Sequence, residues 1–520
     1  MNGTNIDAEI EQAEVKCSQL LKKVKDLERQ YEKTKQEHSE ALRKLKALQK
    51  AKVNNENKQK IQVVSRSLES DWIERQFKWS DTIKKLLREI FKFDSFRPKQ
   101  LAAINATISK KDVLLLMPTG GGKSLVYQLP ALVDSGLTLV VSPLISLIQD
   151  QLIALENFGI NAATIHSNTP KEDIKIIYQQ MSDKKSSLKL LYVTPEWIAK
   201  SKRFMSVLKK SYEAGLVSRV AIDEVHCCST WGHDFRPDYG YLGLLRPVLA
   251  NVPFLGLTAT ATSSVLTDIQ TMLSLEDCMI ITAPFNRPNL YYKVFPKFST
   301  KEETLEYLEK LLKENYINQT GIIYTNTIKD TVTLATDLKT RGLRVAPYHA
   351  QLEPHQKKQI HKKWIEKTYQ AVIATVAFGM GIDKPDVRFV IHHSIPRSME
   401  SLYQESGRAG RDGKNADCIV LFSLHDFLKV LGMVSSVMEE KKAFSVLEYC
   451  LNEESCRRAL IATHFEETWD KTNCNQMCDN CNADNKFDSY NITDACVQFH
   501  ELITQANTCD EKLTLNKLLD

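Results

Sequence analysis

The stretch Val113-Leu-Leu-Leu-Met117-Pro-Thr-Gly120-Gly-Gly-Lys123-Ser-Leu-Val-Tyr127 combines an apolar run, a glycine-rich turn and the start of a helical pattern. Strand, loop and helix in this order are the context that a phosphate-binding loop requires. Glycines let backbone N–H groups approach phosphates closely, and the N-terminus of the following helix adds a favourable dipole. The stretch therefore predicts a nucleoside triphosphate site on a parallel sheet, and a glycine-rich turn without function is the alternative.

Individual roles follow from the chemistry of the loop. We expect Lys123 to reach the β- and γ-phosphates of ATP and Ser124 to hold Mg²⁺. Met117 stands where the strict motif begins with glycine, so the match is incomplete. The residues assigned to the nucleotide here are Met117, Thr119, Gly120, Gly121, Gly122, Lys123 and Ser124.

The composition limits the kinds of protein to which this chain can belong. A chain of 520 residues with 43% hydrophobic and 26% charged residues is expected to form two to four globular domains. Its apolar stretches, such as residues 137–148, are interrupted and too short to span a bilayer, so no membrane partner is expected. The net charge of +5 is small, so any nucleic-acid surface must be a local patch. Twelve cysteines without the spacing of a disulfide framework favour a reduced, intracellular protein.

From about residue 70 to 425 the chain alternates short apolar runs with helical patterns, which is typical of parallel sheets with crossover helices. The runs expected to form buried strands include residues 113–117, 137–142, 188–193, 220–222, 254–257, 321–324, 371–374, 389–391 and 418–422. Their spacing predicts two α/β units in tandem.

An acidic motif, Asp223-Glu224-Val225-His226, follows one of these runs about one hundred residues after the phosphate loop. Carboxylates at the end of a buried parallel strand are costly unless they serve a ligand. We expect Asp223 to complete the Mg²⁺ shell through water and Glu224 to polarise the attacking water. The tetrapeptide alone is weak, but the phosphate loop before it and residues 258–262 (Thr-Ala-Thr-Ala-Thr) after another strand make the set specific.

The second unit offers positive charge for the transition state. Residues 403–412 read Tyr-Gln-Glu-Ser-Gly-Arg-Ala-Gly-Arg-Asp, and two arginines three apart on one helical turn can both face a cleft between lobes. We assign Arg411 as an arginine finger, Arg408 as its phosphate-contacting neighbour and Gln404 as a link. The small residues between them indicate close approach of another surface, and a solvated basic turn is the alternative.

Residues 6–48 carry about six heptads with mostly apolar seam positions, which favours a coiled coil over a long solvated helix. It predicts self-association or docking onto a partner helix. Late in the chain, Cys456, Cys474, Cys478 and Cys481 are separated by seventeen, three and two residues. We expect the first cysteine on a helix over residues 453–465 and the four thiolates to hold Zn²⁺. A redox pair is the alternative, and it explains only two of the four.

The ordered set of motifs resembles the RecQ family of superfamily-two DNA helicases, in particular its short animal members with an N-terminal coiled coil. Phe93, Arg97 and Gln100 are similar to the family's adenine-reading motif, and Arg457-Arg458 are similar to the pair after its first zinc cysteine. Ser142 lies in a stretch that resembles a strand-contacting motif, and residues 374–383 resemble the motif that couples the two sites.

Residues 229–239 resemble the family's aromatic-rich loop, which senses single-stranded DNA and relays this to ATP hydrolysis. In this loop the aromatic side chains supply stacking platforms and the basic ones a phosphate contact, although a buried core loop is the alternative. The residues assigned to DNA are Ser142, Trp231, His233, Phe235 and Arg236.

The resulting expectation is an α/β fold of two tandem RecA-like lobes with an N-terminal coiled coil and a helical zinc-binding subdomain. The expected divisions are 1–53 coiled coil, 54–70 linker, 71–288 first lobe, 289–425 second lobe, 426–482 zinc-binding subdomain and 483–520 the start of an incomplete winged helix. The resemblance implies a nuclear, ATP-dependent 3′–5′ helicase that moves on single-stranded and forked DNA in repair, recombination and replication. The short C-terminus would impair strand separation. The alternatives are an RNA-dependent ATPase and a catalytically weak DNA-binding adaptor.

Overall fold

The computed structural model describes residues 71–229, 236–376, 378, 384–483 and 490–508, together with the single residue 16. The chain divides into two compact units, Met1–Phe285 and Asn286–Asp520, which are described separately below. The predicted coiled coil and linker lie outside the described residues, apart from residue 16.

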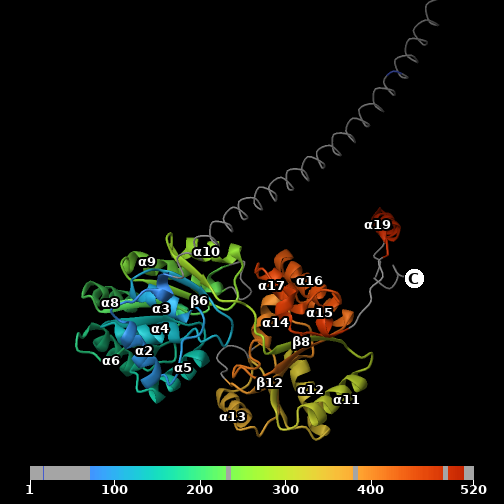
Figure 1. Ribbon diagram of the computed structural model, residues 1–520, viewed down its shortest axis with the longest axis horizontal. Coiled ribbons are helices and arrows are strands. Elements are labelled where there is room, and N and C mark those ends of the chain that lie inside the picture. The colour runs from blue at the N-terminus through green and yellow to red at the C-terminus, as the bar shows by residue number, and fades with distance from the viewer. Residues whose placement is uncertain are drawn as a thin grey trace, which may run out of the picture. The chain divides into compact units, whose positions relative to one another are not determined.

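The first unit is built on a seven-stranded parallel sheet with the order β3-β4-β2-β5-β6-β1-β7 (Figure 1). Its strands are β1 (Val113–Leu116), β2 (Leu137–Val141), β3 (Ala162–Ile165), β4 (Leu190–Val193), β5 (Val217–Ile222), β6 (Phe254–Thr258) and β7 (Met279–Thr282). Its α-helices are α2 (Ser80–Glu89), α3 (Gln100–Ile108), α4 (Leu125–Val133), α5 (Ile145–Asn157), α6 (Lys171–Ser182), α7 (Pro195–Lys200), α8 (Lys202–Glu213), α9 (Leu245–Val248) and α10 (Ser263–Leu273). Two 3₁₀ helices, η1 (Val225–Cys228) and η2 (Pro237–Leu244), follow β5.

Both faces of this sheet are buried, because successive side chains of a strand point to opposite faces. In β1, Leu114 and Leu116 belong to one hydrophobic core, whereas Val113 and Leu115 belong to another. Helices α6, α8 and α10 contribute to the first core, and helices α2, α3 and α4 contribute to the second. Double coverage explains why most residues of the central strands are apolar.

The second unit contains a six-stranded parallel sheet with the order β10-β11-β9-β12-β13-β8. Its strands are β8 (Leu290–Pro296), β9 (Thr320–Tyr324), β10 (Val345–Tyr348), β11 (Ala371–Ala374), β12 (Val387–His392) and β13 (Ala416–Phe422). The helices among them are α11 (Lys301–Lys310), a π-helical turn η3 (Leu311–Asn315), α12 (Ile328–Thr340), α13 (Pro354–Ile365) and α14 (Met399–Ser406). The ring of Phe389 on β12 occupies the space where a side chain at Gly321 on β9 would lie.

The chain of the second unit then becomes helical, with α15 (Leu424–Leu431), α16 (Val437–Leu451), α17 (Arg457–His464), the 3₁₀ helix η4 (Lys471–Cys474), α18 (Asp479–Asn482) and α19 (Thr493–Thr508). The expected helix over residues 453–465 is therefore too long. Helix α17 begins at Arg457, because Cys456 has extended backbone angles and occupies the N-cap position.

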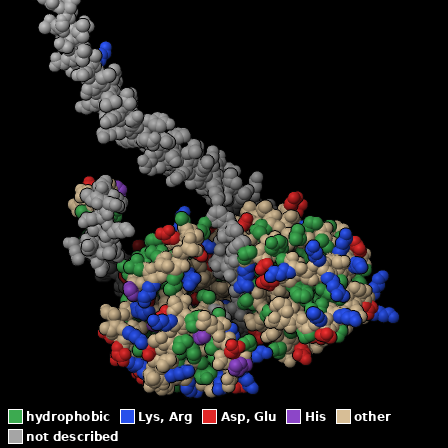
Figure 2. All heavy atoms as spheres, turned by 180° about the vertical axis from the view of Figure 1, so that it is seen from behind, with side chains coloured by type: hydrophobic (Ala, Val, Ile, Leu, Met, Phe, Trp, Pro, Cys, Tyr) green, Lys and Arg blue, Asp and Glu red, His purple; other side chains and the backbone are tan. Residues whose placement is uncertain are grey.

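The prediction of two parallel-sheet lobes is confirmed, and each of the nine predicted runs overlaps one strand. Among the described helices none has the length and apolar composition needed to cross a membrane. On the face shown in Figure 2, basic and acidic side chains are interspersed, in keeping with the small net charge.

Candidate functional site

The phosphate loop follows β1 and leads into α4, as expected from its sequence. Gly120 and Gly122 have φ values of 78° and 86°, a left-handed region that favours glycine. Lys123 Nζ donates a hydrogen bond to the carbonyl of Met117 at 3.2 Å, and the Met117 N–H donates to the carbonyl of Thr258 at 3.0 Å. The loop is thus anchored at its base to the end of β6, while Gly120 and Gly122 give it the left-handed turns that a phosphate-binding loop uses.

The residues predicted to read adenine contact the phosphate loop. Gln100 is 3% exposed, and its Nε2 donates to the carbonyls of Gly122 at 2.9 Å and Gly121 at 3.4 Å. Its Oε1 accepts from the Arg97 N–H at 2.8 Å, and the Arg97 guanidinium donates to the carbonyl of Gly120. Phe93, by contrast, is 50% exposed. The motif therefore braces the loop, and its contact with adenine stays a prediction.

The acidic motif lies directly after β5. Its Asp223 N–H donates to the carbonyl of Val141 at 2.9 Å. Burial and the neighbouring Glu224 raise the pKa of Asp223 above its ordinary value, against the opposing effect of Lys123. Glu224 adopts a left-handed backbone conformation, with φ 48°, which is unusual for a residue with a side chain and is found at functional sites. Its Oε2 is buried without a hydrogen-bond partner among the described residues, so this oxygen can accept a bond from a bound group.

Two further side chains connect these parts. His226 Nδ1 lies 2.9 Å from Thr258 Oγ1 and 3.4 Å from Glu224 Oε2. Because β5, β6 and β1 are neighbours in the parallel sheet, Asp223, Thr258 and the phosphate loop lie close together at the carboxyl ends of these strands. His226 belongs to the acidic motif, but no role was predicted for it.

The predicted DNA contacts are only partly described. Trp231, His233 and Phe235 lie outside the described residues. Ser142 is buried, and its Oγ has no hydrogen-bond partner within the described part of the chain. Arg236 Nη1 donates to the carbonyl of Pro143 at 3.1 Å, so the end of the aromatic-rich loop is tied to the stretch that contains Ser142.

Tyr239, which was not among the predicted site residues, connects the same loop with the acidic motif. Its ring is buried, and its hydroxyl donates to the carbonyl of Asp223 at 2.9 Å. A buried hydroxyl that satisfies a backbone carbonyl beside the carboxylates fixes the position of both segments.

The two arginines of the second unit lie in turns that follow α14. The prediction that they share one helical turn is wrong, because α14 ends at Ser406 and Gly410 has a φ of 55°. Arg408 is 3% exposed, and Arg411 is half-buried. Gln404 lies half-buried on the last turns of α14.

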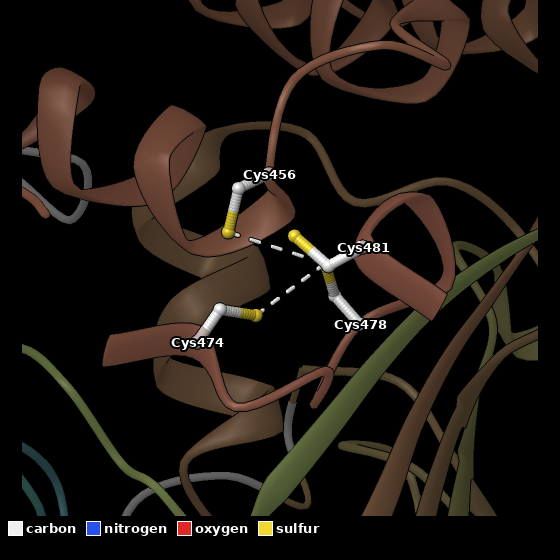
Figure 3. A group of neighbouring side chains, drawn as sticks. All are labelled: Cys456, Cys474, Cys478 and Cys481. Carbon is white, nitrogen blue, oxygen red and sulfur yellow. Dashed lines mark hydrogen bonds between the residues drawn. The ribbon is translucent and has the colours of Figure 1, made fainter. Parts of the chain in front are cut away.

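The four cysteines form a compact cluster (Figure 3). Their Sγ atoms all lie within 4.8 Å of one another, with Cys474 and Cys478 3.7 Å apart and Cys478 and Cys456 4.0 Å apart. Four sulfurs around Zn²⁺, at Zn–S distances of about 2.3 Å, would be about 3.8 Å apart. A redox pair would account for two of these sulfurs, whereas the structure gathers all four in one cluster. The hydrogen bond with the Cys478 thiol lowers the pKa of Cys456, and the backbone amides of Ala459 and Arg458 do the same, against burial. The donor set fits Zn²⁺.

Three stretches of the chain match known families. Residues 97–269 match the DEAD/DEAH box helicase family, residues 303–413 the helicase conserved C-terminal domain and residues 426–482 the RecQ zinc-binding domain. The chain is 51% identical over 452 residues to the ATP-dependent DNA helicase Q1 of Rattus norvegicus, which covers 86% of this chain and 72% of that protein. It is 45% identical over 457 residues to a putative ATP-dependent DNA helicase Q1 of Caenorhabditis briggsae, with 86% and 74% covered.

Solved structures with the same fold are more distant in sequence. The DUF1998 helicase MrfA bound to DNA has a TM-score of 0.55 at 17% identity, covering 66% of this chain and 51% of that chain. The DEAD-box helicase Mss116 bound to ssRNA and UDP-BeF has a TM-score of 0.54 at 16% identity, covering 77% and 88%. At this identity the likeness concerns the fold alone.

Proposed function

The chain belongs to the RecQ family and is an ATP-dependent DNA helicase, and from that premise we propose that it moves 3′ to 5′ along single-stranded DNA. The observation that carries the proposal is the meeting of the phosphate loop, Asp223 and Thr258 at the ends of three neighbouring parallel strands. The direction of movement rests on the family resemblance.

We assign the first half of the ATP site to the first unit. Lys123 binds the β- and γ-phosphates, and Ser124 with Asp223 provides the oxygen ligands that Mg²⁺ prefers. When bound, Mg²⁺ supplies positive charge that neutralises the phosphates. Glu224 accepts a proton from the attacking water, and its buried Oε2, which accepts no hydrogen bond from the described residues, supports this role. Phe93, Arg97 and Gln100 hold the adenine side of the nucleotide.

The second unit supplies the other half. Arg411 is proposed to stabilise the charge on the γ-phosphate in the transition state, with Arg408 as a phosphate-contacting neighbour and Gln404 as a link. In this mechanism ATP closes the two lobes on each other and hydrolysis lets them part. A DNA strand held by both lobes then advances with each turnover.

DNA is proposed to act on hydrolysis through the aromatic-rich loop. Trp231 and Phe235 stack on bases, while His233 and Arg236 contact phosphates, together with Ser142. The bonds of Arg236 to Pro143 and of Tyr239 to Asp223 support a path from this loop to the carboxylates.

Three further proposals concern the stability of the zinc-binding subdomain, the assembly of the protein and its location in the cell. Zn²⁺ held by Cys456, Cys474, Cys478 and Cys481 ties α17 to the irregular segment before α18. We propose that residues 6–48 form a coiled coil for self-association or a partner helix, and that the protein acts on forked DNA in the nucleus during repair, recombination and replication.

The decisive experiment compares ATP hydrolysis with single-stranded DNA, duplex DNA and RNA under one set of conditions. It is followed by unwinding of duplexes with a 3′ or a 5′ tail. We expect single-stranded DNA to give the strongest stimulation and the 3′-tailed duplex to be unwound. Equal stimulation by RNA would contradict the assignment of single-stranded DNA as the activating strand, and preference for the 5′ tail would contradict the direction.

A further inference from the structure

Residues 407–415 carry the two site arginines, Arg408 and Arg411, and are called here the arginine loop. The guanidinium of Arg287 holds the start of this loop. Arg287 lies in residues 286–289, the segment just before β8, which is called here the strand-entry segment. It donates from Nη1 to the carbonyl of Gly407 at 3.3 Å. Its Nη2 donates to the carbonyls of Ala409 at 3.0 Å and Gly410 at 2.9 Å. Three peptide planes on either side of Arg408 are therefore oriented by a single side chain.

Asn289, two residues further, reinforces this hold. Its Nδ2 donates to the carbonyls of Gly410 and Lys414, both at 2.8 Å. A Cβ at Gly410 would overlap that amide, so glycine is required for this approach as well as for its positive φ. At Gly410, therefore, the small residue is explained by contacts within the second unit.

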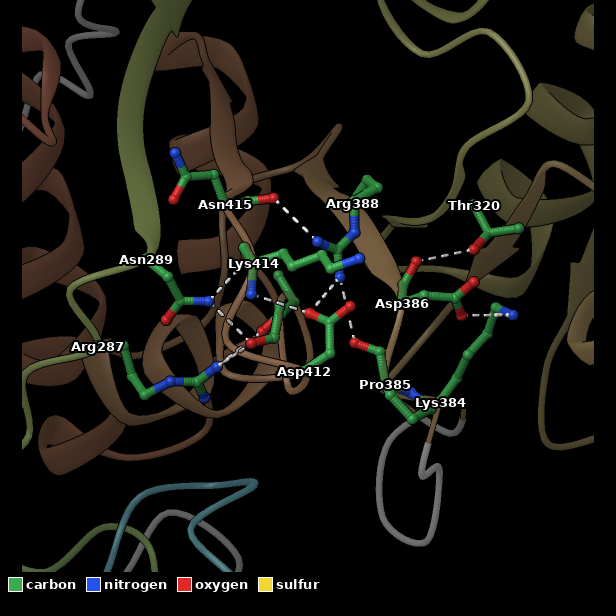
Figure 4. A network of polar contacts seen from close by, with 12 residues as sticks. Arg287, Asn289, Thr320, Lys384, Pro385, Asp386, Arg388, Asp412, Lys414 and Asn415 are labelled. Carbon is green, nitrogen blue, oxygen red and sulfur yellow. Dashed lines mark hydrogen bonds and ion pairs between the residues drawn. The ribbon is translucent and has the colours of Figure 1, made fainter.

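The opposite side of the arginine loop is held by β12 and the residues before it (Figure 4). Arg388 pairs with Asp412 at 2.6 Å and donates to the carbonyls of Pro385 and Asn415, each at 3.2 Å. The Gly410 N–H donates to the carbonyl of Val387 at 2.9 Å. With β12 fixing one side, the placement of the arginines depends on the contacts that Arg287 and Asn289 make on the other.

The segment that carries Arg287 is itself held by Arg458, two residues after the first zinc cysteine. Arg458 is 4% exposed, and its guanidinium donates to the side chain of Asn286 and to the carbonyls of Arg287 at 2.8 Å, Pro288 at 3.3 Å and Leu290. Four hydrogen bonds from this buried guanidinium, three of them to backbone carbonyls, fix the strand-entry segment to the start of α17.

The segment that carries Cys474, Cys478 and Cys481 also forms hydrogen bonds with β8, an edge strand of the sheet. The Tyr292 N–H donates to the carbonyl of Met477 at 3.3 Å, and the Val294 N–H donates to Asp479 Oδ2 at 2.8 Å. Asp479 in turn pairs with Arg457 Nε at 2.9 Å. Residues 286–296 thus lie between the cysteine cluster on one side and the arginine loop on the other.

We propose that Arg287 is a positioning residue that aims Arg411 at the γ-phosphate, and that Arg458 couples the cysteine site to this arrangement. The inference rests on the proposed role of Arg411. Misplacing a group that contacts the transition state by about 1 Å can cost about 100-fold in rate. Loss of the three bonds of Arg287 therefore lowers kcat for ATP about 10- to 100-fold, with KM for ATP and affinity for single-stranded DNA nearly unchanged.

The first test measures DNA-stimulated ATP hydrolysis and hydrogen–deuterium exchange of residues 407–415 in the full chain. We expect Arg287→Gln to lower kcat and speed exchange in the arginine loop, and Arg287→Lys to retain part of both. Arg341→Gln is the matched control, since this arginine of the second unit pairs with Glu302 and Glu309 and contacts no residue of the arginine loop in the bonds described. It keeps full activity and unchanged loop exchange.

A double variant separates positioning from general stability. If Arg287 acts through Arg411, adding Arg287→Gln to Arg411→Ala lowers kcat no further, whereas independent effects multiply. Full activity of Arg287→Gln beside an inactive Arg411→Ala would overturn the inference alone. Full activity of Arg411→Ala would overturn the proposed finger, and the inference with it.

The second test concerns Arg458. We expect Arg458→Gln to retain its bound zinc, measured by metal analysis, while exchange in the arginine loop rises and kcat falls by a factor similar to that of Arg287→Gln. Arg458→Lys serves as the second variant, because a lysine preserves the charge but reaches fewer of the carbonyls. Unchanged loop exchange in folded, zinc-loaded Arg458→Gln would overturn the coupling.

Discussion

The replacement Lys123→Ala separates the catalytic role of this residue from its part in folding. In the structure its Nζ makes one described hydrogen bond, to the Met117 carbonyl at 3.2 Å, and the side chain is half-buried. Loss of one such bond costs about 0.5–1.5 kcal/mol of unfolding free energy. That corresponds to a fall in Tm of a few degrees for a unit of this size.

The expected effect on activity is much larger. A lysine charge about 4 Å from a phosphate charge, at an effective dielectric constant of about 20, contributes about 4 kcal/mol. Since 1.4 kcal/mol corresponds to a factor of ten, kcat/KM for ATP should fall about 1000-fold. Stability and activity therefore respond to Lys123→Ala by clearly different amounts.

The assay measures phosphate release with saturating single-stranded DNA, thermal unfolding and DNA affinity by fluorescence anisotropy. DNA affinity should stay within about twofold, because Lys123 belongs to the nucleotide site. Lys110→Ala is the matched control: its Nζ bonds the Ser218 carbonyl at 3.4 Å and lies 3.9 Å from Asp134, and it should lose similar stability but keep its ATPase. Undiminished hydrolysis by Lys123→Ala would refute the assignment of the phosphate loop.

Four further outcomes are expected. Glu224→Gln should bind ATP but turn over at least about 100-fold more slowly, and normal turnover would show that another group activates the water. Trp231→Ala should reduce stimulation by DNA more than the basal ATPase rate, whereas equal losses would indicate a structural role. Removing zinc with a chelator, or replacing Cys478 with serine, should increase hydrogen exchange across residues 426–482, and an unchanged exchange and melting profile would contradict the zinc site. Gly321→Ala should destabilise the second unit by about 1–3 kcal/mol in chemical denaturation, because its Cβ would overlap the buried Phe389 ring.

The strands recognised from the sequence share one physical property. The nine apolar runs correspond to β1, β2, β4, β5, β6, β9, β11, β12 and β13, which are the internal strands of the two sheets. Four strands were not predicted, namely β3, β7, β8 and β10, and they are the edge strands. An internal parallel strand is covered on both faces and flanked on both sides, so most of its residues are apolar, whereas an edge strand tolerates more polar residues.

The site residues divide in a similar way. Glycine and lysine in the phosphate loop, the carboxylates after β5 and the cysteine spacing carry their chemistry in residue type and local order, so the sequence indicates them directly. Arg287, Asn289 and Tyr239 were missed because they bond backbone carbonyls. A carbonyl acceptor is the same for every residue type, so such a contact leaves no pattern at the accepting position.

By itself the sequence determined that this chain holds a triphosphate-binding loop, an acidic motif, a pair of arginines and a four-cysteine cluster on two parallel-sheet units. Only the tertiary structure decided that the arginines lie in turns after α14 instead of on the helix, and that Arg287 and Arg458 connect them to the cysteine cluster. The physical reason is distance along the chain. Arg287 and Gly410 are 123 positions apart, and Arg458 and Arg287 are 171 apart, so only the pairing of β8 with β13 and the docking of α17 bring them together.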